Sequence, residues 1–158
     1  MKRHMLTLLV FILILTACTA CTAPQNDNHY SAEFPYEPLQ YMTFLKKEIQ
    51  SIENQLNSAM SLAVMGDYTA DQAADTAKNS LSIIESAKDS IKVMRPPTEY
   101  ADTRVYALDT IAQIENDMDK FIEELENPDK SSERLIEIKN KLQGDSVSLA
   151  SLVNAYWE

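Results

Sequence analysis

The chain has 158 residues, and its 24 acidic side chains against 14 basic ones give a net charge of -10 at pH 7. This balance argues against a nucleic-acid partner, because affinity for phosphate backbones comes from Lys and Arg. Only two glycines occur in the chain, too few for the turns of a typical β fold. Length and composition therefore predict one all-α domain with a core of its own.

A basic and then apolar segment opens the chain. Residues 1–17 contain no acidic side chain, Lys2 and Arg3 come first, and residues 6–15 are apolar except for Thr7. An apolar run of this length is too short to span a bilayer, which takes about 20 residues. It is typical of a secretory signal peptide, so residues 1–17 are predicted to be removed on export.

The segment ends in Leu15-Thr16-Ala17-Cys18, which resembles the lipobox of bacterial lipoproteins. The resemblance implies cleavage before Cys18 and a diacylglyceryl group on its sulfur, a covalent lipid with no further cofactor. It places the protein on the extracytoplasmic face of the cell membrane, or in the outer membrane of a cell that has two. The alternatives are ordinary cleavage near Ala17 or Ala20, and an uncleaved anchor.

Residues 18–37 are predicted to form a flexible, lipidated tether. Residues 22–28 are polar and unpatterned, and Pro35 and Pro38 interrupt any helix. A flexible segment of this length typically reaches roughly 25 Å. Cys21, the second cysteine, matches the lipobox less well, and no cysteine follows it, so the folded region has no internal disulfide.

Residues 38–158 are predicted to form a helical bundle domain with helices at 39–65, 70–94, 98–126 and 132–156. Their apolar residues recur at spacings of three and four, as Met42, Leu45 and Ile49 do in the first helix. Thr69 and Gln72 have the spacing of a capping box at the start of the second helix. Near the middle of the fourth helix, Gly144 is expected to kink or break it.

In the third helix, the apolar stripe is predicted to pass through Ala101, Val105, Leu108, Ile111 and Met118. Four such helices joined by short loops favour an up-down-up-down antiparallel four-helix bundle. The alternative is a three-helix or splayed arrangement whose core is completed in an oligomer.

The connection between the second and third helices carries a second resemblance. Its sequence, Met94-Arg95-Pro96-Pro97-Thr98-Glu99-Tyr100, resembles a junction in small helical lipoproteins of unknown function from Gram-positive bacteria. Those proteins often have a histidine a few residues after the aromatic residue, where this chain has Thr103 and Arg104. The resemblance supports the helical bundle and implies no mechanism.

The bundle topology brings six aromatic residues to the end where the tether joins. They are the candidate binding residues, namely Tyr41, Phe44, Tyr100, Tyr106, Tyr156 and Trp157. Aromatic side chains of this kind can line a site for an apolar ligand or partner. The alternative is a plug of the core that also holds the C-terminus in place. At the other end, small alanines face large apolar residues, which favours close packing over a pocket.

Four acidic residues, Glu115, Asp119, Glu123 and Glu126, share one face of the third helix. Like charges at four-residue spacing destabilise a helix slightly, so a basic partner or a divalent cation could offset them. A simply solvated face is the other interpretation.

No catalytic or metal-binding residues are predicted. After residue 17 the only histidine is His29, in the tether, which excludes Ser-His-Asp and Cys-His catalysis. The sequence thus favours a non-enzymatic interaction module that is held to the membrane by its lipid and binds another envelope protein or peptide. The alternative is a lipoprotein that binds or senses a small ligand at its aromatic end.

Overall fold

The computed structural model describes residues 36–62 and 69–156. The predicted signal peptide, the lipobox, the tether up to residue 35 and Trp157 lie outside the described residues. Within them, the helices are α2 (Pro38–Leu62), α3 (Ala70–Val93), α4 (Ala101–Glu126) and α5 (Ser132–Asn154), and the 3-10 helix η1 (Thr98–Tyr100) leads into α4. The described residues contain no β-strand.

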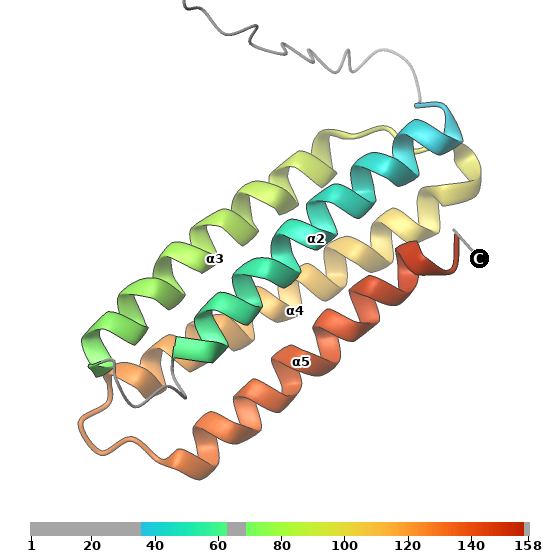
Figure 1. Ribbon diagram of the computed structural model, residues 1–158. Helices are drawn as coiled ribbons and strands as arrows, with labels where there is room; N and C mark the ends of the chain where they lie inside the picture. The colour runs from blue at the N-terminus through green and yellow to red at the C-terminus, as the bar shows by residue number, and fades with distance from the viewer. Residues whose placement is uncertain (1–35, 63–68, 157–158) are drawn as a thin grey trace, which may run out of the picture. The chain divides into compact units, whose positions relative to one another are not determined.

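The four helices form an up-down-up-down antiparallel bundle, which confirms the predicted fold class (Figure 1). Each helix packs against the next along the chain, and α5 packs back against α2. The bundle therefore closes within a single chain. Its centre is filled by apolar side chains from all four helices, including Leu45, Ile84, Ile111 and Leu149, each with no exposed surface.

Local signals in the sequence account for the helix starts. The backbone N–H of Thr69 donates to Gln72 Oε1 over 3.0 Å, and the N–H of Gln72 donates to Thr69 Oγ1 over 3.3 Å. This is the predicted capping box, which satisfies two backbone donors at the start of α3. Ser131 caps α5 by accepting from the N–H of Arg134 over 3.4 Å.

The predicted stripe of α4 was wrong at its beginning. Ala101 is exposed and Val105 is 57% exposed, whereas Ala107 and Ile114 are fully buried beside Ile111. At about 100° per residue, Val105 lies roughly 120° around the helix from Ile111, and Ala107 only about 40° from it. A spacing of three and four fits both stripes over a single turn, and packing selects the one through Ala107.

The predicted break at Gly144 does not occur, because α5 is one continuous helix from Ser132 to Asn154. Gly144 has a negative φ, and an added Cβ would meet no atom within 4 Å. Buried Leu142 and Leu149 on either side hold this stretch against the core. That packing outweighs the cost of about 1 kcal/mol that a glycine carries inside a helix.

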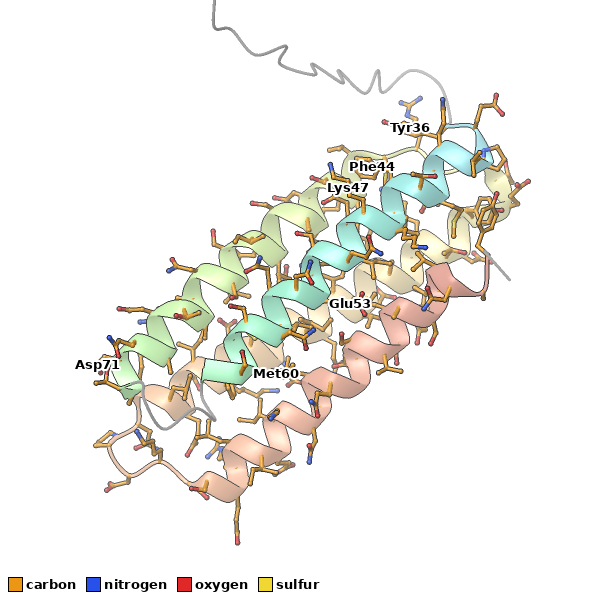
Figure 2. All side chains as sticks on the ribbon, in the orientation of Figure 1. Tyr36, Phe44, Lys47, Glu53, Met60 and Asp71 are labelled. Atoms are coloured by element: carbon orange, nitrogen blue, oxygen red, sulfur yellow. The ribbon has the colours of Figure 1, made fainter. Side chains whose placement is uncertain are left out.

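The two ends of the bundle differ in what they join. One end, the Tyr36 end, holds the start of α2, the connection from α3 to α4 and the end of α5 (Figures 1 and 2). There the backbone N–H of Tyr36 donates to the carbonyl of Arg95 over 3.1 Å. The other end, the Asp71 end, holds the start of α3 and the loop from α4 to α5.

Small and large residues meet at the Asp71 end, as the sequence predicts. The buried residues there are Ala59, Ala73, Ala77, Phe121, Ile122 and Leu125. All of them belong to the same buried core, so the alanines are covered rather than lining an open surface.

Candidate functional site

Three of the six aromatic candidates form a row of rings across the Tyr36 end. Tyr41 from α2 stacks on Tyr100 from η1, with centroids 5.8 Å apart and planes at 21°. Tyr100 meets Tyr156, just beyond α5, edge-on at 5.7 Å and 76°. Both geometries are favourable for aromatic pairs. The row therefore ties the start of α2, the α3–α4 connection and the end of α5 together.

The other three candidates lie differently. Phe44 is partly buried and packs against the core, one turn along α2 from Tyr41 (Figure 2 labels Phe44). Tyr106 lies on the surface of α4 and is 50% exposed. Trp157 is outside the described residues. Whether the group as a whole binds a ligand stays a prediction.

Two buried polar atoms at this end have no hydrogen-bond partner among the described residues. They are the hydroxyl of Tyr41 and Nε of Arg104. Burial raises the pKa of Tyr41 to about 12, while the positive charge of Arg104 acts in the opposite direction. Arg104 also donates through its guanidinium to the carbonyl of Lys92. Tyr41 is therefore a neutral donor at neutral pH, and it lies near a cation.

Sequence reasoning missed Arg104, because its contribution depends on how α4 lies beside the end of α3. The only sequence signal is its place one turn after Tyr100, on the first turn of α4. Buried donors without a protein acceptor usually bind water or a ligand oxygen, because leaving such a donor unpaired is unfavourable.

An open recess of about 250 Å³ lies between α3 and α4. Its lining is entirely charged, namely Glu85, Lys88, Asp89, Lys92 and Glu115. Lys88 pairs with Glu115 across the two helices, and Lys92 Nζ lies 2.9 Å from Asp89 Oδ1. Charges that already pair with each other leave little free affinity for an anion or a cation.

The acidic face of α4 is partly neutralised by α3. Glu115 pairs with Lys88 and Glu126 pairs with Lys78. Asp119 and Glu123 are exposed. Two lysines of α3 thus offset two of the four acids, while the other two are exposed as the interpretation of a solvated face expects.

Two further acids of α4 are buried, on the side that faces α5. Glu124 is 5% exposed; its carboxylate accepts from the N–H of Ser131 over 2.6 Å and lies 3.3 Å from Arg134 Nε. Asp117 is 1% exposed and accepts from Lys120 over 2.7 Å, while its Oδ2 has no partner among the described residues. Sequence reasoning missed both residues, although they are seven apart and so share a face.

Asp117 also acts on a third acid, across the interface. Desolvation raises the pKa of Asp145 on α5; the charge of Asp117 raises it further, and Lys141 lowers it. Where the chain is described, no group of three or more candidate ligands could hold a metal ion, and no helix is long and apolar enough to cross a membrane.

The chain matches no protein-family model, no curated protein and no solved structure at a significant level. Any functional argument therefore rests on the residues of the chain itself.

Proposed function

We propose that the protein is a lipid-anchored, non-enzymatic interaction module that binds another envelope protein or peptide on the extracytoplasmic face of the membrane. The observation that carries this proposal is the lipobox, Leu15-Thr16-Ala17-Cys18, at the end of a short apolar segment. The bundle begins at Pro38, about twenty residues later. This spacing suits a folded body on a short tether.

The charge of the body supports a protein partner rather than a nucleic acid. Without Lys2 and Arg3, the chain after residue 17 keeps 24 acidic and 12 basic side chains. Strong acidity of this kind favours association with cationic surfaces and raises the rate of encounter with them. Asp119 and Glu123 are exposed on α4 and available for such contacts.

Photocrosslinking in the cells that make the protein tests this proposal. A photoreactive residue replaces Asp119 in the full chain, and adducts are identified by mass spectrometry. A dominant adduct that disappears in the Cys18→Ala variant is the expected result, because loss of the anchor removes the protein from its partner. The same label at Gln143, exposed on α5, is the control. If no discrete adduct forms from either position, the proposal is wrong.

A second candidate function, binding of a small ligand at the aromatic end, is favoured by one observation. The buried hydroxyl of Tyr41 and Nε of Arg104 both lack an acceptor among the described residues. A ligand oxygen between them would satisfy both donors. Binding raises the melting temperature by mass action. A compound that stabilises the full chain but not its Tyr41→Phe variant would support this function over the first.

A further inference from the structure

Exposed apolar side chains gather at the Tyr36 end. Among the described residues, seven large apolar side chains are exposed; Val147 lies seven residues before the end of α5, and four others lie within six residues of a helix terminus at this end. These four are Leu39 in α2, Val93 in α3, and Val105 and Tyr106 in α4, with exposed fractions between 50% and 69%. Among the described residues of the corresponding third at the Asp71 end, Ile136 is the one large apolar side chain that is exposed.

The four side chains surround the end rather than covering one side of the bundle. Val105 and Tyr106 are consecutive in α4, so they point about 100° apart around the helix. Leu39 and Val93 come from two other helices. A protein docked on one flank could not cover all four. A surface that meets the bundle end-on could contact all of them at once.

The balance of acidic and basic side chains also differs between the two ends of the bundle. The third at the Tyr36 end (residues 36–46, 86–109 and 147–156) has five acidic and five basic side chains. The third at the Asp71 end (residues 54–62, 70–78 and 118–140) has nine acidic and five basic side chains. One end is therefore neutral and bordered by apolar groups, and the other is strongly acidic.

The chain itself connects the neutral end to the proposed anchor. Residue 35 is joined to Tyr36, whose N–H is bonded to the Arg95 carbonyl, so the segment that begins at Cys18 enters the bundle at this end. Seventeen residues lie between Cys18 and Tyr36, and a flexible chain of that length would reach roughly 25 Å. A lipid on Cys18 would therefore keep this end near the bilayer.

We propose that the Tyr36 end is a membrane-facing surface that rests in the headgroup region, with the Asp71 end directed into water. This proposal rests on the proposed lipidation of Cys18. Amphipathic segments bury apolar groups about 5–10 Å into the headgroup boundary, a depth that admits the first turns of α2 and α4. Tyrosines such as Tyr106 are favoured at this depth, because their rings are apolar and their hydroxyls are polar.

Repulsion opposes the alternative in which the bundle lies flat. Charges at an anionic membrane surface act over about 8 Å at physiological ionic strength. A bundle lying on its side would bring the acids on one face of the Asp71 end within this range. An upright bundle keeps them about 25 Å or more from the Tyr36 end, because the nearest of them is 17 helical residues from that end at 1.5 Å each.

Spin-label accessibility in vesicles tests the proposal on the full lipidated chain. With Cys21→Ser as background, labels are placed by Val105→Cys and, as the matched control, Ile136→Cys, because both side chains are 57% exposed. The vesicles contain phosphatidylcholine and phosphatidylglycerol. We expect a water-soluble nickel chelate to reach the label at 105 about threefold less once the protein is anchored, and the label at 136 unchanged.

A second variant checks that apolar side chains cause the contact. Leu39→Ser with Val93→Ser should restore the accessibility at 105, whereas Ile83→Ser with Ile136→Ser, two exposed side chains away from this end, should not. Equal accessibility at 105 and 136 in a protein that floats with vesicles overturns the membrane contact and leaves the anchor standing. Failure to float overturns both proposals. Shielding at 105 without vesicles indicates a protein contact instead and also overturns this one.

Discussion

Helix α4 has acidic residues on the flank toward α3 and on the flank toward α5, and the two groups differ in their exposure to solvent. Toward α3, Glu126 pairs with Lys78 where both side chains are 49% exposed, and Glu115 pairs with Lys88 at 17% and 19% exposure. Toward α5, Glu124 is 5% exposed and its partner Arg134 is 64% exposed. Glutamate is thus half-exposed or partly buried toward α3, and almost fully desolvated toward α5.

Because of this difference in burial, the exposed acids contribute little to the stability of the fold, whereas the buried acids are important for it. Exposed ion pairs contribute about 0–1 kcal/mol, because water screens the charges and the side chains lose entropy. A buried carboxylate has lost its hydration, so its remaining partners must replace it. The α4–α5 interface is therefore more sensitive to its acids than the α3–α4 interface.

The largest expected effect comes from Glu124. We expect Glu124→Ala to lower the free energy of unfolding by about 2 kcal/mol, because it removes a charged acceptor from the Ser131 N–H and the Arg134 guanidinium. Ser131 caps α5, so the loss also loosens the start of that helix. Glu126→Ala, on the opposite flank, should change stability by less than about 0.5 kcal/mol.

Urea denaturation of both variants measures this contrast directly. Equal losses would show that the burial of Glu124 carries no special weight, and the distinction between the two flanks would fail. A loss confined to Glu124→Ala would establish the distinction. The exposed neighbour Glu123→Ala serves as the control for helix propensity.

The two cross-helix pairs on the α3 flank should differ from each other. A double-mutant cycle on Lys88 and Glu115 should give a coupling energy of about 1 kcal/mol, because both side chains are largely buried. The cycle on Lys78 and Glu126 should give a smaller coupling energy, because both side chains are about half exposed and water screens the pair. Added salt should weaken the second coupling more. Equal couplings would mean that burial does not decide the strength of these pairs.

Helix α5 contains a glycine, Gly144, that lowers its stability. Gly144→Ala should raise the free energy of unfolding by about 0.5–1 kcal/mol, because alanine favours the helix and restricts the unfolded chain. The site has room for the added Cβ, with no atom within 4 Å. A destabilised variant in a thermal melt would indicate that the glycine allows a local distortion that α5 needs.

The sequence predicted most of the fold because long helices repeat their pattern many times. In α2, the predicted stripe through Met42, Leu45 and Ile49 is buried at 0–1% exposure. Over seven turns the period leaves one possible phase. In the first turns of α4, apolar residues at spacings of three and four occur on two faces, and Val105 was placed on the wrong one.

The candidate site was less predictable, because it depends on contacts between distant segments. Topology alone gathers Tyr41, Tyr100 and Tyr156 at one end, as the structure also places them. The burial of Asp117 could not be inferred, because acidic residues are rarely buried and its 1% exposure depends on how the helices pack. Paired charges such as Lys88 with Glu115 likewise require the register between two helices.

The smallest expected effect tests the repulsion between acids across the α4–α5 interface, and it depends on pH. Burial and Asp117 raise the pKa of Asp145 above the ordinary value, about 3.9. In this direction the folded state holds its proton more tightly than the unfolded state, so stability falls as the pH rises through the interval between the two values. Above the raised pKa the loss is complete.

Asp145→Asn removes this loss. Its free energy of unfolding should match the natural protein near pH 4 and exceed it by roughly 0.5 kcal/mol at pH 7, a small gain because Asp145 is only partly buried. Urea denaturation at several pH values measures the difference, with Asp119→Asn, exposed on α4, as the control. A variant less stable than the natural protein at pH 7 would mean that attraction to Lys141 outweighs burial and Asp117. The charges at the α4–α5 interface would then stabilise the fold rather than destabilise it.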